Sequence, residues 1–359
     1  MLAVLYHPPR GWARRGLRLL GLLALVSACA APATTPPPAA PTPTGTAGPA
    51  QTAPATTPPQ ATHVSVAYPA KSVTMTGFYV AIAQGYTREE GVDAEMVYMN
   101  GTLSAQGIVA HQVDFGMSAG ALLAAHLRGA PIQNIFVQID KPLFSLFAQP
   151  DVRTWEDLVG KPVGIAAVGD STQLAASAAL TSHGVSPDQV TFIANVTGNE
   201  VTAALQAGAV AGAVTAPPVD LAAERLGFRD LGFLGDYLDY LTAGLATHED
   251  TIRDQPALVQ AVVRAELKAH RFMQQQRERT LPLMADFLEI EPADAAIAYD
   301  RYLKYLTTDG LSTPQQLEGI LRTAEKELQL EQPASVAEAF QLRFARQAAQ
   351  ELDRAGWRP

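Results

Sequence analysis

Short apolar segments typical of β-strands alternate with helical segments through most of the chain, and this alternation restricts the fold more than any other feature. The first block starts at His63, and glycines such as Gly85 and Gly129 end its helices. Strands that alternate with helices favour a mostly parallel sheet covered by helices, so we expect an α/β fold. The expected strands are 63–68, 92–99, 113–117, 132–138 and 143–148, with helices at 77–84, 103–110 and 119–128 and a turn with capping-box spacing at 87–90.

A second block repeats the alternation, and a helical region follows it to the end of the chain. Two successive α/β blocks within about 300 residues predict two lobes of ordinary size. Helical spacing of apolar and charged residues predicts further helices near 256–276, 277–288, 292–306, 313–328 and 335–352. The strands expected in the second block are 162–166, 189–194, 210–214, 230–234 and 242–246, and its best-marked helix is 171–182.

The two blocks contain similar segments, 108–118 and 205–215. Each reads as a helix end, a tight turn, a strand and then a hydroxyl residue that opens the next helix. The similarity is also what any strand–helix repeat would give, so both readings stay open. If the blocks are equivalent, Ser118 and Thr215 lie at matching strand C-termini, where ligands bind in open α/β sheets.

The N-terminal segment has the order of a secretory signal: basic residues, a short apolar run and small residues before a cleavage point. Four arginines and no acid precede the run 19–26, which is shorter than the ~20 residues that span a bilayer. Ser27-Ala28-Cys29 then resembles a bacterial lipobox, which implies a signal at 1–28 and lipidation of Cys29. The alternative is an ordinary signal with an incidental cysteine. Since Cys29 is the single cysteine, it forms no internal disulfide and no CxxC metal site.

Residues 29–62 are rich in Ala, Pro and Thr and carry no charge or aromatic ring. Such a segment buries too little apolar surface to offset its ordering entropy, so we expect a disordered, semi-stiff tether. Cleavage of the signal removes four arginines and takes the net charge from −9 to −13. This acidity, without a basic stripe, argues against nucleic acid as a partner and leaves the lipid as the link to an outward-facing membrane surface.

Four ordered motifs between residues 63 and 330 resemble the NMT1/THI5-like substrate-binding proteins of ABC importers, of the sulfonate, nitrate and taurine type. The motifs are Gly77-Phe78-Tyr79-Val80-Ala81-Ile82-Ala83-Gln84-Gly85-Tyr86 with Glu89-Glu90-Gly91-Val92-Asp93; Val113-Asp114-Phe115-Gly116 with Arg128-Gly129-Ala130-Pro131; Trp155-Glu156-Asp157-Leu158-Val159-Gly160-Lys161-Pro162-Val163-Gly164; and Ala203-Ala204-Leu205-Gln206-Ala207-Gly208 with Ala216-Pro217-Pro218.

The resemblance implies a two-lobed type II periplasmic-binding-protein fold with a cleft between the lobes. Crossovers near 143–148 and 242–246 would make lobe 1 from 63–145 and 246–359, and lobe 2 from 146–245. It also implies a monomer that is not an enzyme, takes a small solute outside the cytoplasm and delivers it to an importer permease with its ATPase.

The best candidate for solute binding is the turn Gly169-Asp170-Ser171-Thr172 at a helix start. Free backbone N–H groups, the helix dipole and the hydroxyls of Ser171 and Thr172 suit a sulfonate, carboxylate, nitrate or phosphate oxygen. The alternative is that these hydroxyls only cap their helix. Further candidate ligand contacts are Thr74, Thr76, Phe78 and Tyr79, whose aromatic rings suit a planar heterocycle, and Ser118 and Thr215; Phe78 could equally belong to the core.

Two rival functions deserve comparison. Gly116-Met117-Ser118-Ala119-Gly120 matches the G-x-S-x-G pattern of a serine hydrolase, between a strand and a helix as that pattern requires. The histidines His183, His248 and His270 follow it, but His270 lies in a helical segment. No oxyanion loop precedes Ser118, so we favour the binding protein. A lipoprotein sensor remains the second rival. No HExxH, clustered Cys/His, P-loop or GxGxxG motif supports a cofactor or a metal, and His111 replaces a glycine usual in the resembled family.

Overall fold

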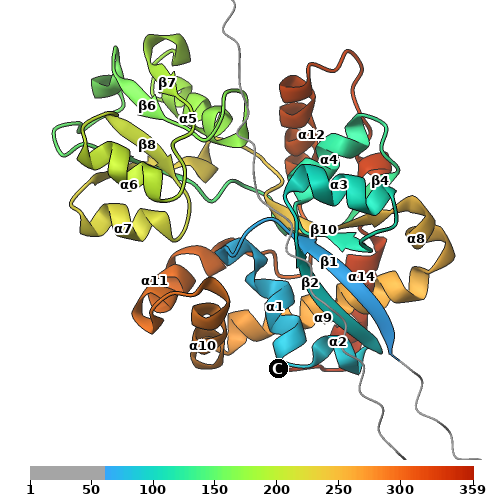
Figure 1. Cartoon of the computed structure of the whole chain (residues 1–359). Helices are drawn as coiled ribbons and strands as arrows, with labels where there is room; N and C mark the ends of the chain where they lie inside the picture. The colour runs from blue at the N-terminus through green and yellow to red at the C-terminus, as the bar shows by residue number, and fades with distance from the viewer. Residues whose placement is uncertain (1–60) are drawn as a thin grey trace, which may run out of the picture. The chain divides into compact units, whose positions relative to one another are not determined.

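The structure is a computed structural model, and it describes residues 61–359. The predicted signal, Cys29 and nearly all of the predicted tether lie outside the described residues. Two five-stranded sheets organise the rest of the chain. Both are mixed, with parallel strands on one side and one antiparallel strand inserted (Figure 1). The predicted α/β class is therefore confirmed.

Sheet A has the order β2-β1-β3-β10-β4. Strands β1, β2 and β3 are parallel, and β10 runs antiparallel to β3 and β4. Along β1, Val64 and Val66 face one core and Ala67 faces another, as the two-residue period of a strand buried on both faces requires. The strands are β1 (Thr62–Tyr68), β2 (Val92–Tyr98), β3 (Phe115–Gly116), β4 (Ile132–Ile139) and β10 (Ala243–His248).

Sheet B has the order β7-β6-β8-β5-β9, which repeats the pattern of sheet A strand for strand. Here β5 is the antiparallel strand, between β8 and β9. The chain therefore passes from β4 into β5 and returns from β9 to β10. Since β10 starts at Ala243, the predicted lobe division at 245/246 falls inside this strand. The strands are β5 (Ser145–Ala148), β6 (Pro162–Gly164), β7 (Thr191–Ile193), β8 (Gly212–Thr215) and β9 (Arg229–Phe233).

Helices cover both faces of each sheet (Figure 1). On sheet A, α3 and α4 pack against the face of Ala67, and α1, α9 and α14 share the core of Val64 and Val66. On sheet B, α5 packs on one face and α6 and α7 on the other. Their bounds are α1 (Thr76–Ala83), α3 (Gly101–Val109), α4 (Ala119–Leu127), α5 (Ser171–Ser182), α6 (Asn199–Gln206), α7 (Val219–Arg225), α9 (Pro256–Gln275) and α14 (Arg343–Arg354).

The remaining helices belong to the C-terminal region, except for the single turn α2. Thr313 and Gln316 form a capping box at the start of α12, with Pro314 at the first helical position. The predicted helix 335–352 is wrong as one piece. It breaks at Phe340, which bridges Asn134 of β4 and buries its ring. These helices are α2 (Tyr86–Glu89), α8 (Glu249–Asp254), α10 (Arg277–Leu288), α11 (Pro292–Tyr302), α12 (Pro314–Leu328) and α13 (Val336–Ala339).

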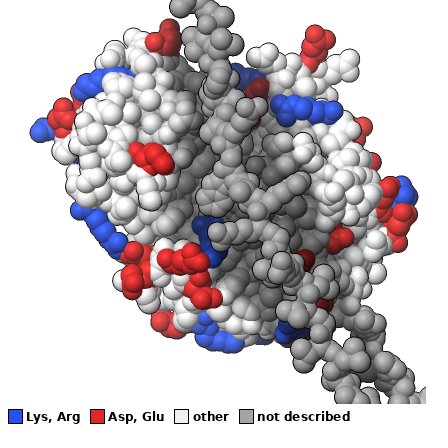
Figure 2. Space-filling model, in the orientation of Figure 1, with Lys and Arg blue, Asp and Glu red and all other residues white. Residues whose placement is uncertain are grey.

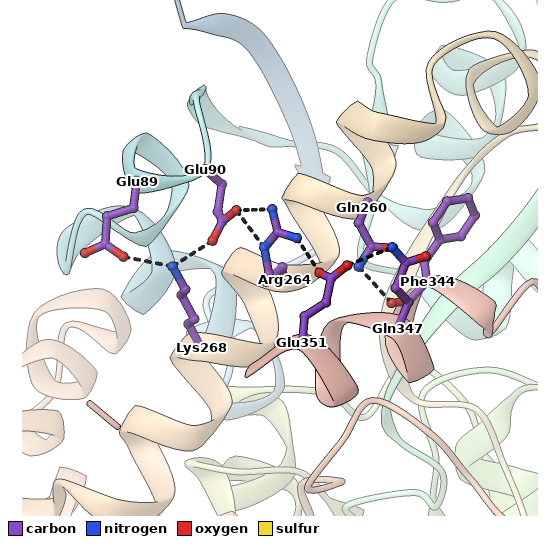
Figure 3. A network of polar contacts seen from close by, with 8 residues as sticks. All are labelled: Glu89, Glu90, Gln260, Arg264, Lys268, Phe344, Gln347 and Glu351. Atoms are coloured by element: carbon purple, nitrogen blue, oxygen red, sulfur yellow. Dashed lines mark hydrogen bonds and ion pairs between the residues drawn. The ribbon is translucent and has the colours of Figure 1, made fainter. Parts of the chain in front are cut away.

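A buried network of ion pairs fastens α2, α9 and α14 together (Figure 3). Glu90 receives Lys268 Nζ at 2.6 Å and Arg264 Nη2 at 2.5 Å, and Arg264 also reaches Glu351 at 2.5 Å. Glu90 was expected to close a capping box with Thr87 as the N-cap. In the structure α2 starts at Tyr86, so Thr87 lies inside the helix and the Glu90 carboxylate joins this network instead. Tertiary ion pairing therefore decided the role of Glu90.

On the part of this face that the picture shows uncovered, Lys and Arg side chains are scattered and acidic side chains gather at the lower left (Figure 2). No helix within residues 61–359 is long and apolar enough to cross a membrane.

Candidate functional site

Loops that follow parallel strands of both sheets meet at one cavity. The turn η1 (Val73–Met75) follows β1, and Ala216 and Pro217 follow β8. These loops and the two chain crossings enclose about 150 Å³. The lining residues are Ser72, Val73, Thr74, Leu143, Phe144, Ala216, Pro217 and Thr242, and none of them is charged. Ligands of open α/β sheets bind at such strand ends, so we call this the inter-sheet cavity and take it as the candidate solute site.

The candidates on the first loop and α1 divide between cavity and core. Thr74 lines the cavity, whereas Thr76 and Phe78 are fully buried, and Phe78 belongs to the core of sheet A. Tyr79 turns toward α10: its hydroxyl donates to Asp286, and its ring stacks on Phe287 at 5.0 Å. The hydrogen bond to Asp286, aided by burial, raises the pKa of Tyr79 to about 12. Of these four residues, only Thr74 lies on the cavity surface.

The turn before α5 has its own internal hydrogen bonds. Asp170 is the N-cap, and its carboxylate accepts the N–H groups of Thr172 and Gln173 at 3.0 and 3.1 Å. The Thr172 hydroxyl donates to Asp170 at 2.6 Å and accepts the Ala166 N–H at 2.9 Å. Gly169 adopts φ +80°, a conformation that favours glycine. Asp170 is a strong N-cap residue, so sequence reasoning could have assigned the cap to it.

Tyr240 joins this turn to sheet A, and the sequence reasoning missed it. Burial raises the pKa of Tyr240 to about 12, with a further rise from the charge of Glu327 and an opposing effect of a hydrogen bond with the Ser171 side chain. A Cβ on Gly120 of α4 would lie 3.4 Å from the Tyr240 hydroxyl and 2.4 Å from the Leu241 carbonyl. Glycine at this position therefore lets the segment approach α4. An aromatic residue three positions before the crossover strand β10 was the available signal.

Ser118 and Thr215 occupy matching places but differ in bonding. Ser118 follows β3, and Thr215 is the last residue of β8; each of these strands is the third in the order of its sheet. The Thr215 hydroxyl donates to the Ser145 carbonyl at 3.1 Å. The Ser118 hydroxyl is buried and has no hydrogen-bond partner among residues 61–359. No histidine within that range forms a hydrogen bond with the Ser118 hydroxyl.

A larger cavity of about 640 Å³ lies between α3, α4 and α12. Its walls are mainly apolar, and the polar residues among them are Thr102, Gln106, Arg128, Tyr240 and Glu327. Tyr240 is thus shared between this cavity and the Ser171 turn. No local pattern predicts this space, because α12 reaches it from nearly 200 residues beyond α4.

Contacts between α7 and the C-terminal helices join the two halves of the fold. Arg301 of α11 donates to Asp220 at 2.9 Å and to Glu224 at 2.6 Å, and the Tyr302 hydroxyl also bonds Asp220. Arg225 of α7 also pairs with Asp294 of α11. Both of its terminal nitrogens donate to the carboxylate, one of them at 3.0 Å. Phe233, the last residue of β9, stacks on Tyr305 at 4.6 Å. We refer to the Asp220, Glu224, Arg301 and Tyr302 contacts as the α7–α11 latch.

Comparison with known proteins finds solute-binding proteins among the relatives of this chain. The chain is 29% identical over 256 residues to riboflavin-binding protein RibY of Chloroflexus aurantiacus, which covers 69% of this chain and 70% of that protein. The putative sulfonate-binding protein SsuA of Methylobacillus flagellatus has a similar fold, with a TM-score of 0.69, 18% identity and coverage of 84% of this chain and 97% of its own.

The fold also occurs in the desulfurization enzyme DSZB, with a TM-score of 0.63, 13% identity and coverage of 81% of this chain and 99% of the enzyme. Fold alone therefore does not separate binding proteins from enzymes. The family model described as NMT1/THI5 like matches residues 72–280, which is more than half of the sequence. That match extends from η1, the turn after β1, through the whole of sheet B and past β10. On this evidence the chain belongs to the NMT1/THI5-like family.

Proposed function

We propose that this protein is the extracytoplasmic solute-binding component of an ABC importer. The observation that carries the proposal is the inter-sheet cavity, whose walls come from loops of both sheets and from both chain crossings. A ligand that touches both halves favours the closed arrangement, because its differential affinity shifts the open–closed balance. A permease can then distinguish the loaded protein from the empty one by shape.

The solute we propose is an uncharged planar heterocycle of the riboflavin type. Two observations favour it over a sulfonate or nitrate. The residues lining the inter-sheet cavity include no lysine or arginine, and a relative at 29% identity is a riboflavin-binding protein. The net charge of −9 also repels anions at long range. Hydroxyls of Ser72, Thr74 and Thr242, which line the cavity, would then serve as hydrogen-bonding groups for a neutral ligand.

The cavity volume implies motion. About 150 Å³ is below the ~300–1,000 Å³ usual for small-molecule sites. A ring system can enter only if the two halves separate and then close to a wider spacing. The described arrangement, with the α7–α11 latch made, would be the ligand-free closed form, and we expect the latch to form again when the halves close around the solute.

The test is a titration of the full chain with riboflavin, followed by quenching of the flavin fluorescence and by calorimetry. We expect one site per chain and an affinity at least ~100-fold tighter than for ethanesulfonate or nitrate, about 3 kcal/mol. An equal or tighter binding of the anions would overturn the heterocycle assignment. Binding of neither class would count against the solute proposal as a whole.

We also propose that lipid on Cys29 anchors the protein to the outer side of the cell membrane. The lipobox-like Ser27-Ala28-Cys29 and the Pro/Thr-rich segment after it support this. Cys29→Ala should move the protein from the membrane fraction to the soluble fraction. Unchanged membrane retention in that variant would contradict the anchor.

A further inference from the structure

A side-chain cluster lies at the end of strands β3 and β10 that points away from the inter-sheet cavity. Its members are His111, His248 and Asp250. His111 precedes β3, whereas Ser118 follows it, and β10 runs antiparallel so that His248 at its end meets the His111 turn. The Thr247 hydroxyl donates to the Asp114 carbonyl at 2.6 Å and ties the two segments together. Residues 137 positions apart thus supply two imidazoles and a carboxylate to one place.

The distances suit a metal ion. One ligand atom from each residue lies within 4.8 Å of the others, and the two imidazole centroids are 4.4 Å apart. Ligand atoms around tetrahedral zinc lie roughly 3.3 Å apart, since each is ~2.0–2.1 Å from the ion. His248 Nδ1 and Asp250 Oδ2 are already 3.6 Å apart. His111 is exposed, so its ring can rotate to close the remaining ångström.

The surrounding groups hold two of the three ligands in place. The His248 side chain is 9% exposed, and its Nδ1 accepts the Asp250 N–H at 3.0 Å. An ion would take over Nδ1 from that amide. Arg253 Nη1 binds the other oxygen of Asp250 at 2.7 Å, as an outer partner orients a metal-binding carboxylate.

The backbone at His111 supports a role for its side chain. His111 adopts φ +52°, and Gly208 adopts φ +64° at the matching turn before β8. A residue with a side chain is costly in this conformation, whereas glycine is not. An imidazole thus stands at a position that glycine would occupy without this cost.

We propose that His111, His248 and Asp250 bind one divalent transition-metal ion, with Zn²⁺ as the ion that fits best. Two imidazoles and a carboxylate are a common zinc ligand set, and three protein ligands leave a position for water. The ion would link the turn before β3 to the end of β10 and the start of α8. This site is independent of the proposed solute and of the importer.

The experiment uses the full chain, freed of metal by a chelator that is then dialysed away. Zn²⁺ is titrated in competition with a chromogenic chelator, and thermal unfolding is recorded with and without the ion. We expect one equivalent to bind and the melting temperature to rise. His111→Gly keeps the turn, and His248→Asn keeps an N-cap acceptor, so both variants should fold; each should weaken zinc binding by more than about tenfold.

Matched controls are His63→Asn, an exposed histidine near Asp93 and Glu95 on the same sheet, and Cys29→Ala. Both should leave zinc affinity unchanged. The proposal is overturned if the wild-type chain takes up no zinc at 100-fold excess over protein. It is equally overturned if His111→Gly retains wild-type affinity, or if either control removes the binding.

Discussion

The two sheets share one strand order but differ in size and in what covers them. In sheet A, β1 pairs with β2 over 7 residues, and helices from the C-terminal region enlarge its core. In sheet B, β6 pairs with β7 over 3 residues, and the core on its α5 face is built from nearby sequence. One topology therefore supports a large half and a small half.

The difference in size suggests different mechanical roles for the two halves. Long strands and a large core make sheet A and its helices the rigid base, because stability grows with buried apolar area. The small half needs only enough core to keep its loops in place while it moves against that base. Hinge-type closure around a ligand requires such internally packed bodies. The predictions below change one half or one matching position at a time.

The largest effect is expected in the ion network of the large half. The Glu90 side chain is 8% exposed and pairs with both Arg264 and Lys268. Replacing Glu90 by Gln removes this shared partner. Loss of one member of a buried pair should lower the free energy of unfolding by about 3 kcal/mol, as measured by urea denaturation.

The matched control is Glu89→Gln, which removes one 2.9 Å contact to Lys268 from a carboxylate 52% exposed. A change below about 1 kcal/mol is expected there. Equal losses in the two variants would mean that burial of the network contributes nothing.

The same network predicts acid sensitivity. Burial raises the pKa of the Glu90 carboxyl, but hydrogen bonds from Arg264 and Lys268 outweigh it, and the net pKa lies below the ordinary 4.5. A lowered folded-state pKa contributes stability above the unfolded pKa, and this contribution disappears as the pH falls through the folded pKa. Wild type should thus lose more stability than Glu90→Gln between pH 6 and pH 3, and parallel losses would contradict the assignment.

The next prediction separates the two halves at the α7–α11 latch. Arg301→Ala removes both hydrogen bonds to α7, one of them to Asp220, whose side chain is 1% exposed. Charged hydrogen bonds contribute ~1.5–3 kcal/mol, so solute affinity should fall about tenfold or more as the closed form loses support.

Arg225→Ala is the control for the latch, because Arg225 is 56% exposed and reaches only Asp294. Its effect on solute affinity should stay within about fivefold. If Arg301→Ala binds solute with the affinity of the wild type, the latch does not stabilise the closed form.

Several parts of this picture were open to sequence reasoning, and particular residues show why others were not. The order of strands and helices followed from period and from turn glycines, and the helix predicted at 313–328 matches α12 to within one residue, with Thr313 as its N-cap. Partners distant in sequence were out of reach. Tyr240 meets Ser171, α12 meets α4, and Phe340 breaks a helical pattern to reach β4. Tertiary contacts override local preference at each of these places.

A smaller effect should distinguish Ser118 from Thr215, which occupy matching positions. Ser118→Ala removes a buried hydroxyl without a partner among residues 61–359, so stability should stay within ~0.5 kcal/mol. If that hydroxyl binds solute, affinity falls about two- to tenfold. Thr215→Val removes the bond to Ser145 and should instead cost ~1 kcal/mol of stability.

The reverse outcome, stability lost at Ser118 and affinity lost at Thr215, would break the assignment of roles. Labelling of Ser118 by a fluorophosphonate probe, absent in Ser118→Ala, would revive the hydrolase reading.

The smallest effect concerns the matching turns at His111 and Gly208. Both have a positive φ, +52° and +64°, so alanine at position 208 should cost about 1 kcal/mol in metal-free buffer. Glycine at position 111 relieves the corresponding strain but adds entropy to the unfolded chain, and it gives up the contact of the His111 and His248 rings. These opposing effects should leave His111→Gly within ~0.5 kcal/mol of wild type without metal. Zinc should then stabilise wild type and Gly208→Ala alike, and leave His111→Gly unchanged. If zinc raises the melting temperature of all three, the two turns are equivalent in function as well as in shape, and the side chain of His111 is incidental.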